Sequence, residues 1–572
     1  MLSDSHMERK GNEMKVIEKF KRNLYNYRWT MIWIITIIII FAPSIKAGIC
    51  LVDEVELRLN NVKGYLNACK VFIGEAQYQG RVTNALPFIL FSNLAFRLKS
   101  TFFFRSVSAL IITLSFYMVC RLLYKITDNK TYAKFLFLFL LICLPFTMEH
   151  TIPNGFVALL GMPFVLLFFS LNCYVELLKT GKKYMQLIVC LCLFIALCSY
   201  EAFIVYTPLY LIMVIYYKKK NIKEIIKNLF FPALTGVIYL IIYVAQRLIF
   251  PTNYSGNEIG FSSVSESLTI LINLFKTGIP GYFCGTDKYK YVYYSAVETG
   301  IRPSGLGKIK YFLENIMSVR MFVLVLLTIL LIYKIWNEKT DLSKLKNKCG
   351  IIIVAMVYMF MPSIPISLSS AYQNNVHENA FMALPVSYYI YIAGCVCITS
   401  VLWWLLAEKT TAFKRGLLLL VVLLEFVPTQ CLNERVLKIQ RENYEDYLYV
   451  EQMLGTSTVQ SYIQDKIVYA DDLYKTVAGR RVYLSLIADT LYDYQTVFCD
   501  SSQQEEAAVT ITWEQQGFFV LDNGEKRVIV SNCPLDVCLI QNYNGINEIV
   551  YAVNGSYDNN LLVYEVSDVC EE

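Results

Sequence analysis

Several charged residues follow the first long apolar run of this sequence. Asp53 and Glu54 are adjacent, Arg58 follows them, and Arg81 lies further along the same polar interval. Neighbouring carboxylates suit general-base chemistry, in which one carboxylate accepts the proton of an attacking hydroxyl group. Most of the chain before residue 430 alternates apolar runs with short basic connectors, so an acidic pair here is unusual. We interpret this interval as the candidate catalytic site, although solvated loop charges or a helix start would also explain the pair.

Other ionisable residues fall on the membrane face where we predict this interval to lie. The candidates for substrate binding are Arg58, Arg81, Glu149, His150, Glu201, Arg247, His377 and Glu378. Structural explanations exist for them too, because outer turns often carry such residues and an arginine can anchor a helix to lipid headgroups. Acidic groups there could bind Mg²⁺ or Mn²⁺ through oxygen ligands, but no spacing demands a metal.

The composition is that of a membrane protein. Of the 572 residues, 56% are hydrophobic and 17% are charged, and the mean hydropathy is +0.44, which is too apolar for a soluble protein of this size. The net charge of +6 is carried by connectors between apolar runs, so it indicates membrane topology and not nucleic-acid binding. We predict a mainly α-helical, polytopic membrane protein.

The apolar runs predict about eleven transmembrane helices of roughly 20 residues each. The first, from Trp29 to about Cys50, follows a basic segment at residues 1–28 and carries bulky isoleucines, which favours an uncleaved span over a signal peptide. The others are predicted near residues 105–124, 135–148, 153–178, 184–200, 202–217, 229–250, 320–336, 350–368, 382–406 and 416–432.

Basic connectors predict the orientation of these spans. Lys-rich segments recur at residues 121–134, 179–183, 218–227, 334–348 and 409–415, which the positive-inside rule assigns to the cytoplasm together with the amino terminus. The membrane domain, residues 29–432, then has two long outer loops, 51–104 and 251–319. Within them we predict an interfacial helix at Ala85–Phe96 and a helix at Val264–Lys276 that folds back over the membrane face.

The composition changes in residues 433–572, where we predict a small soluble domain. Strand-like runs occur at residues 466–469, 481–484, 508–513, 527–530 and 560–564, and Asp522-Asn523-Gly524 is typical of a hairpin turn. An α/β or β-rich fold is expected. With eleven spans this domain faces outside; if the last span, which contains Glu425 and Pro428, does not cross, the domain is cytosolic.

Four features of the sequence together resemble the GT-C superfamily of membrane glycosyltransferases. They are an acidic pair after one uncleaved span, the segment Tyr78-Gln79-Gly80-Arg81, many further spans and an outer carboxyl-terminal domain. The sequence is most similar to bacterial Gtr-type transferases that use polyprenyl-phosphate sugars. The specific resemblance covers residues 29–215, and beyond them the architecture alone matches. It implies a plasma-membrane enzyme that moves a sugar from a polyprenyl-phosphate donor to a cell-envelope glycan, lipid or protein acceptor on the outer face.

The resemblance also implies roles for individual residues. Asp53 would be the general base and Glu54 its support or a ligand of a substrate hydroxyl, with inversion of the sugar in a single displacement. Arg81, Arg247 and Arg58 would bind the leaving phosphate through their guanidinium forks. The isoprenoid tail stays in the bilayer, so the bond to be broken lies at headgroup level.

Two other classes of function fit part of the sequence. A flippase or transporter of a lipid-linked saccharide would carry charged groups in mid-span and symmetry between its halves, whereas charge in the predicted spans is scarce and no repeat is evident. A non-catalytic envelope assembly protein would bind a partner through its outer domain. In that case Asp53 and Glu54 would be dispensable.

Overall fold

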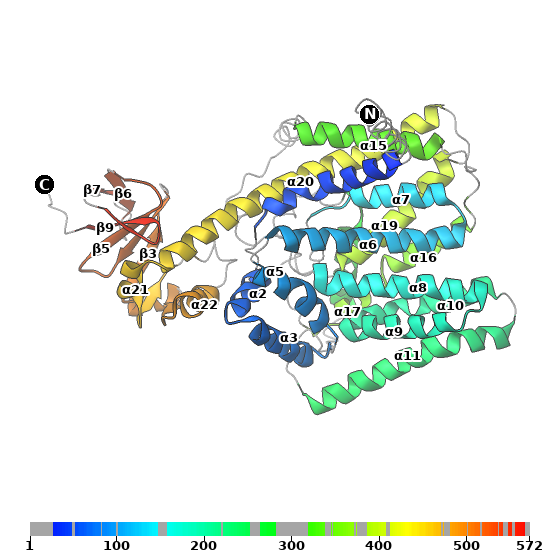
Figure 1. Cartoon of the computed structure of the whole chain (residues 1–572), viewed down its shortest axis with the longest axis horizontal. Helices are drawn as coiled ribbons and strands as arrows, with labels where there is room; N and C mark the ends of the chain where they lie inside the picture. Colours follow the sequence, from blue (N-terminus) through cyan, green and yellow to red (C-terminus); the bar gives the residue numbers. More distant parts are fainter. Residues whose placement is uncertain are drawn as a thin grey trace, which may run out of the picture.

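A helix bundle and a sheet domain, joined by helix α20 (Ala412–Leu454), make up the part of the chain that our computed structural model describes (Figure 1). That part comprises residues 27–48, 52–81, 83–98, 101–146, 151, 157–218, 221–251, 264–281, 318–337, 345, 347–370, 373, 386–407, 412–470, 473, 481–499, 501–514, 517–535, 537–541, 547–551 and 555–566.

Eight helices in the described residues are long and apolar enough to cross a membrane, so the chain is a multi-pass membrane protein. They are Tyr27–Ile45, which overlaps η1 (Ala42–Lys46), α6 (Thr101–Thr127), α8 (Met162–Thr180), α11 (Ile222–Ile249), α15 (Val319–Asn337), α16 (Lys348–Tyr358) with α17 (Ser363–Ser367), α19 (Ser387–Leu402) with η9 (Trp403–Ala407), and α20. The other predicted spans form shorter helices, namely α7 (Lys130–Ile142), α9 (Tyr184–Ser199) and η4 (Glu201–Tyr206) with α10 (Pro208–Tyr217). The predicted number of eleven is therefore not confirmed.

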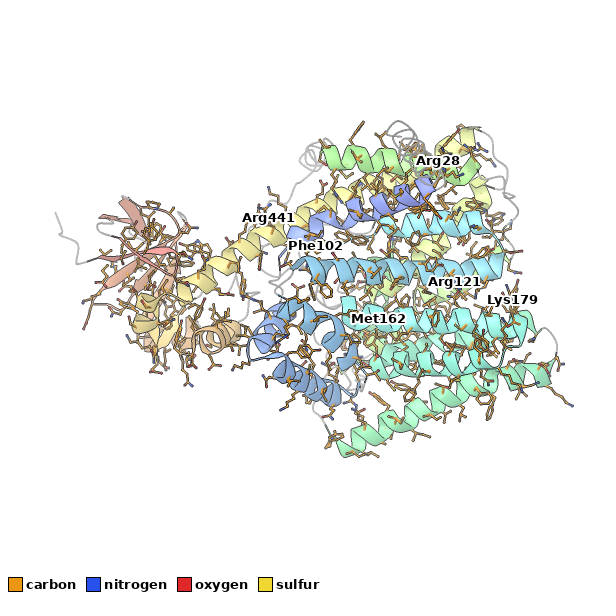
Figure 2. The ribbon with its side chains drawn as sticks, viewed as in Figure 1. Arg28, Phe102, Arg121, Met162, Lys179 and Arg441 are labelled. Atoms are coloured by element: carbon orange, nitrogen blue, oxygen red, sulfur yellow. The ribbon has the colours of Figure 1, made fainter. Side chains whose placement is uncertain are left out.

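The two ends of the bundle differ in character. Arg28, Arg121 and Lys179 lie at one end (Figure 2), whereas residues 52–98 and the sheet domain lie at the opposite end (Figure 1). This separation agrees with the alternation that the Lys-rich connectors predict. Which end faces the cytoplasm stays a prediction.

Residues 52–98 form a group of short helices at the end away from the basic connectors. They are α2 (Val52–Val62), α3 (Tyr65–Gln79), α4 (Ala85–Pro87), η2 (Phe88–Ser92) and α5 (Asn93–Arg97), and η3 (Val157–Gly161) precedes α8 nearby. The helix expected at Ala85–Phe96 is thus present, with a π-helical turn at η2.

The helix expected in the second long loop is present as α12 (Val264–Gly278). Its Phe275 stacks on Phe360, with ring centroids 4.4 Å apart. A Cβ at Gly278 would lie 2.2 Å from the side chain of Ile390. The absence of a side chain at this position therefore lets α12 pack closely against α19.

Helix α20 runs across the predicted domain boundary at residue 432. It continues without a break for 43 residues, about 64 Å at 1.5 Å per residue, from the bundle to the sheet domain (Figure 1). The charged stretch after residue 433 is helical, and ion pairs such as Arg441–Glu445 follow its exposed surface. Gly455 comes directly after its last residue, where a glycine commonly ends a helix.

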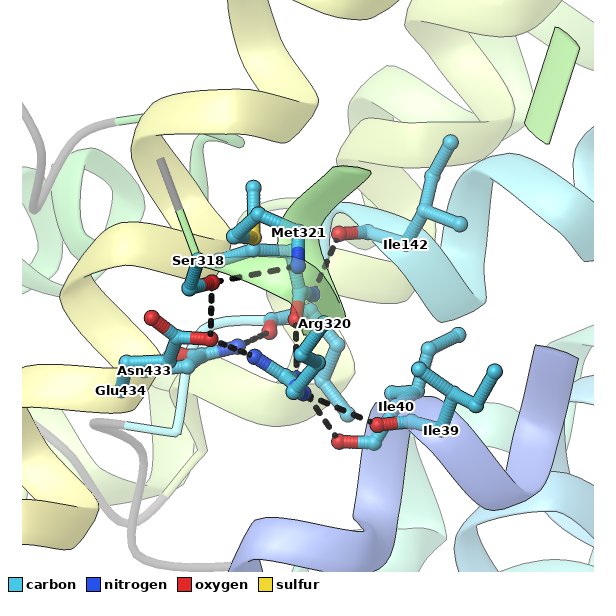
Figure 3. A network of polar contacts seen from close by, with 10 residues as sticks. Ile39, Ile40, Ile142, Ser318, Arg320, Met321, Asn433 and Glu434 are labelled. Carbon is cyan, nitrogen blue, oxygen red and sulfur yellow. Dashed lines mark hydrogen bonds and ion pairs between the residues drawn. The ribbon is translucent and has the colours of Figure 1, made fainter. Parts of the chain in front are cut away.

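A polar network holds α20 to its neighbours where it leaves the bundle (Figure 3). Arg320 at the start of α15 donates to Glu434 at 2.5 Å and to Gln430 at 3.0 Å, and its Nε donates to the carbonyl oxygen of Ile39 at 3.0 Å. Asn433 donates to the carbonyl oxygen of Leu144, beyond α7, at 2.9 Å. Three chain segments are therefore fixed to the exit point of α20.

Within the described residues the carboxyl-terminal domain has a seven-stranded sheet, in the order β2-β1-β3-β4-β5-β9-β8, and a two-stranded sheet, β6-β7. The strands are β1 (Ile467–Tyr469), β2 (Val497–Cys499), β3 (Val509–Trp513), β4 (Phe518–Asp522), β5 (Arg527–Ser531), β6 (Val537–Gln541), β7 (Asn547–Tyr551), β8 (Ser556–Asp558) and β9 (Leu561–Val566), with α21 (Ser457–Ile463), α22 (Arg481–Tyr492) and η11 (Ser501–Glu506). β1 is parallel to β2 and β3, and the other pairs are antiparallel.

Two local predictions in this domain have opposite outcomes. The hairpin turn is confirmed, because Asp522 pairs with Arg527 across β4 and β5 and Gly524 has a φ of +84°. The strand expected at residues 481–484 is wrong, since these residues begin α22. Leu484, Ile487 and Ala488 are buried at helical spacing, so one helix face packs on the sheet.

Asp558 ties the sheet to the start of α21. It accepts hydrogen bonds from the Ser457 hydroxyl at 2.8 Å and the Thr458 amide at 3.0 Å. Burial alone would raise the pKa of Asp558, but these hydrogen bonds outweigh it and hold the pKa below its ordinary value.

Candidate active site

Glu54 forms a buried ion pair with Arg105 between the first turns of α2 and α6. Arg105 Nη1 lies 2.9 Å from Glu54 Oε1, and Nη2 lies 3.3 Å from Oε2. Nη2 also donates to the carbonyl oxygen of Gly48. The side chains are 0% and 1% exposed, and buried charges persist only when each has a partner. The pair therefore ties α2 to α6 and to the end of the first span.

This pairing separates the two carboxylates that the sequence groups together. Glu54 is held inside the protein by Arg105, which accounts for its charge without a substrate. Asp53 lies in the first turn of α2, at the end of the bundle away from the basic connectors. Its side chain falls outside the described residues, so its role as the base stays a prediction.

Arg58 binds α20 in the structure. Its guanidinium group forms two hydrogen bonds of 2.6 Å with the carboxylate of Glu451 and one of 2.8 Å with the Tyr447 hydroxyl. Its central carbon also lies 5.6 Å from the centroid of the Tyr447 ring. These contacts give Arg58 a structural role, because they tie α2 to α20. Its predicted role as a phosphate ligand stays a prediction.

The apolar face of α2 is shared with the carboxyl-terminal domain. Val55 and Leu59 are buried in one hydrophobic core with Val450 of α20 and Leu484 of α22, whereas Leu57 belongs to the core of the bundle. The candidate catalytic helix is therefore packed between both parts of the molecule.

Arg81 and Glu201 meet from the turn after α3 and the start of η4. Arg81 Nε lies 2.9 Å from Glu201 Oε2, and Nη2 lies 2.7 Å from Oε1. Nη1 donates to the side-chain oxygen of Gln79 at 3.0 Å. The central carbon of the guanidinium lies 4.9 Å from the Tyr200 ring centroid. Two residues that the sequence identified separately are thus a bidentate pair.

Arg247, in the last turn of α11, approaches the same turn. Its Nη2 donates to the carbonyl oxygen of Gln79 at 2.6 Å. Gly80 has a φ of +76°, and a Cβ there would lie 2.8 Å from Arg247 Nη2. A glycine is favoured here because it accepts the left-handed backbone and leaves room for the guanidinium. We call Gln79, Arg81, Glu201 and Arg247 the arginine cluster.

The electrostatics of the arginine cluster favour anions. Two guanidinium groups face one carboxylate, so the cluster keeps a net positive charge. Glu201 is that carboxylate. Its oxygens occupy the fork of Arg81 that phosphate oxygens would also fit.

The remaining predicted site residues, Glu149, His150, His377 and Glu378, lie outside the described residues. Among the residues that are described, no three His, Cys, Asp or Glu side chains converge to hold a metal ion. We therefore assign no metal ligands.

Comparisons with known proteins show a distant likeness to a solved structure. No protein-family model matches the sequence, and no curated protein matches it. The crystal structure of ArnT from Cupriavidus metallidurans in the apo state is similar over 95% of this chain and 98% of its own, at 13% sequence identity and a TM-score of 0.34. A likeness at this level establishes neither a shared fold nor a shared activity.

Three residues of interest were not among the predicted site residues. Arg105 begins an apolar run, and a lone arginine there signals a buried partner. Glu451 lies in a stretch that sequence reasoning assigned to the soluble domain. Glu425, within the last span, faces Gly281, whose added Cβ would lie 2.4 Å from Glu425 Oε2. Its Oε1 is buried and has no hydrogen-bond partner among the described residues.

Proposed function

We propose that the protein is a GT-C-type membrane glycosyltransferase that moves a sugar from a polyprenyl-phosphate donor to a cell-envelope acceptor. The observation that carries this proposal is the arginine cluster, which brings two guanidinium groups to one turn in the same group of helices as the acidic start of α2. A phosphate-binding fork and a carboxylate are the two groups that such a transfer needs.

In the proposed reaction Asp53 accepts the proton of the acceptor hydroxyl. The hydroxyl oxygen bonds to the anomeric carbon while the bond from that carbon to the phosphate oxygen breaks. Its electron pair leaves with the lipid phosphate, and attack from the opposite side inverts the anomeric centre. The developing negative charge on the phosphate is stabilised by cations already in position.

Arg81 is the proposed principal phosphate ligand. Glu201 occupies the fork of Arg81 through two short hydrogen bonds, so donor binding would exchange one oxyanion for another. Arg247 supplies a second positive charge beside the same turn. Arg81→Lys should then weaken donor use more than it harms folding, because a point charge cannot replace a bidentate fork. Arg97→Lys, at an exposed position of α5, is the matched control.

The decisive experiment incubates the purified full-length protein with a panel of polyprenyl-phosphate sugars and measures release of the lipid phosphate. Asp53→Asn should lower transfer by a factor of about 10²–10⁴ while the protein stays folded. Glu56→Gln, on the same helix, should leave transfer unchanged. Full transfer by Asp53→Asn would show that Asp53 is not the general base. If the unmodified protein releases no lipid phosphate, the proposed transferase activity is wrong.

Glu425 favours a second candidate, a transporter of a lipid-linked saccharide. A carboxylate within a span is what that class of protein predicts. Glu425 has one buried oxygen, and a Cβ on Gly281 would lie 2.4 Å from the other. Reconstituted vesicles carrying a fluorescent lipid-linked saccharide separate the two functions. Movement of the lipid across the bilayer that Glu425→Gln abolishes, without release of lipid phosphate, would support the transporter.

A further inference from the structure

We propose that a cavity inside the helix bundle binds the hydrocarbon chain of a lipid phosphate. The cavity measures about 210 Å³ and lies between α6, α8 and α10 on one side and α16 and α19 on the other. Its walls are almost wholly apolar and include Phe168, Met213 and Val354. Water in a cavity needs several polar partners, so these walls suit hydrocarbon better than water.

The cavity wall includes residues that also face the surrounding lipid. Ile212 lines the cavity and is 37% exposed. α10 packs against α8 and α11, whereas α16 packs mainly against α19. The wall between α10 and α16 is therefore the place where a chain would enter from the bilayer, which is the apolar solvent of this surface.

Polar and basic groups mark one end of the cavity. Asn347 and Tyr216 line it there, and the Asn347 amide donates to the Tyr216 hydroxyl at 2.6 Å. The ammonium of the adjacent Lys348 lies 4.7 Å from the ring centroid of Trp404, which is 43% exposed. Tryptophan and lysine together are typical of the membrane–water boundary. An anionic head at this boundary is therefore expected.

The dimensions fit one chain of one leaflet. Along α16 the lining runs from Gly350 to Tyr358, about 12 Å at 1.5 Å per residue. One leaflet contributes about 15 Å of hydrocarbon. The polar end of the cavity lies at the end of the Lys-rich connectors, whereas its lining reaches Tyr206 of η4, the helix that begins with Glu201. The inference does not rest on the proposed transferase activity.

Two substitutions fill the cavity, and a third is their control. Ala355 lines the cavity, and Gly350 lines it with no other atom within 4 Å of an added Cβ. Ala355→Phe and Gly350→Leu therefore place hydrocarbon where the chain would lie. Ile353→Phe, on the same helix at a position 60% exposed, adds a ring on the lipid-facing side. All three proteins are first compared in thermal unfolding, so that loss of binding is not loss of fold.

Binding is measured by native mass spectrometry of the full-length protein with farnesyl phosphate in one arm and a single-chain lysophosphatidic acid in the other. We expect saturable binding, unchanged by Ile353→Phe and weakened more than tenfold by each filling variant, since each excluded methylene costs about fourfold in affinity. Tighter binding of farnesyl phosphate would identify an isoprenoid chain, and tighter binding of lysophosphatidic acid would identify an acyl chain. Equal binding by all variants would show that the cavity is not the binding site. Farnesol binding as tightly as farnesyl phosphate would show that the site does not bind an anionic head.

Discussion

Replacing Arg105 by methionine should destabilise the protein by about 4 kcal/mol, because it leaves the Glu54 carboxylate buried without its partner. Both side chains are almost fully buried, so water cannot replace the lost hydrogen bonds. Glu54→Leu alone should cost a similar amount, since it leaves the guanidinium uncompensated. The double variant should cost about 2 kcal/mol or less, because a buried ion pair exchanged for apolar residues is often nearly neutral. Independent losses would instead sum to about 8 kcal/mol.

Unfolding by increasing fractions of a denaturing detergent measures these changes, with the reaction of the buried thiol of Cys120 on α6 as the readout. Arg97→Met, which removes an exposed arginine from α5, should stay within about 0.5 kcal/mol of the unmodified protein. Additive losses in the double variant would refute the pairing. The double variant also tests the catalytic role of Glu54. If the double variant is stable but no longer transfers sugar, Glu54 takes part in catalysis.

The remaining predictions concern the turn after α3, the docking of α2 and the sheet domain. Gly80→Ala should destabilise the protein by about 1–2 kcal/mol because of the left-handed backbone at this position. Gly74→Ala, in the middle of α3, should stabilise the protein by about 0.5–1 kcal/mol. Thermal unfolding compares the two variants, and equal effects would contradict the strained turn. Arg58→Met should lower the stability of the protein by about 2 kcal/mol, because it leaves the Glu451 carboxylate poorly paired. Adding Glu451→Gln should recover part of that loss. The protease resistance of the sheet domain measures both effects. The lowered pKa of Asp558 contributes stability that is present above its ordinary pKa of about 3.9 and is lost as pH falls through the folded pKa; circular dichroism in acid should show a smaller pH dependence for Asp558→Asn, and an identical dependence would count against this carboxylate.

Local patterns in the sequence identified most elements whose signal is contained in one segment. A run of about 20 apolar residues marks a span wherever it occurs, and Asn523-Gly524 marks a hairpin whatever surrounds it. Helix α20 was divided because its composition changes near residue 433, although Gly455 gives the better stop signal. Residues 481–484 read as a strand in a four-residue window, whereas the longer spacing of Leu484, Ile487 and Ala488 indicates a helix.

The partners of the site residues could not be predicted in the same way. Arg81, Glu201 and Arg247 lie far apart in the sequence, and their contact depends on how α3, α9 and α11 end at one side of the bundle. No periodic pattern in the sequence indicates that residues so far apart are in contact. The burial of Glu54 depended likewise on Arg105, whose local sequence is an ordinary apolar helix. Residue type identified the candidates, and the packing of the spans decided which of them pair.

The sequence and the structure give different ion-pair partners to Glu54 and Arg58 of α2. They are one helical turn apart, a spacing that predicts an intrahelical ion pair worth about 0.5 kcal/mol. The structure gives each a partner on another helix, Glu54 on α6 and Arg58 on α20. A weak local interaction is thus replaced by two links that hold α2 from opposite parts of the molecule. Because α20 continues unbroken from the bundle into the sheet domain, a displacement of that domain would reach α2 both through Glu451 of α20 and through the core that α2 shares with Leu484 of α22. The carboxyl-terminal domain is therefore part of the framework that positions Asp53.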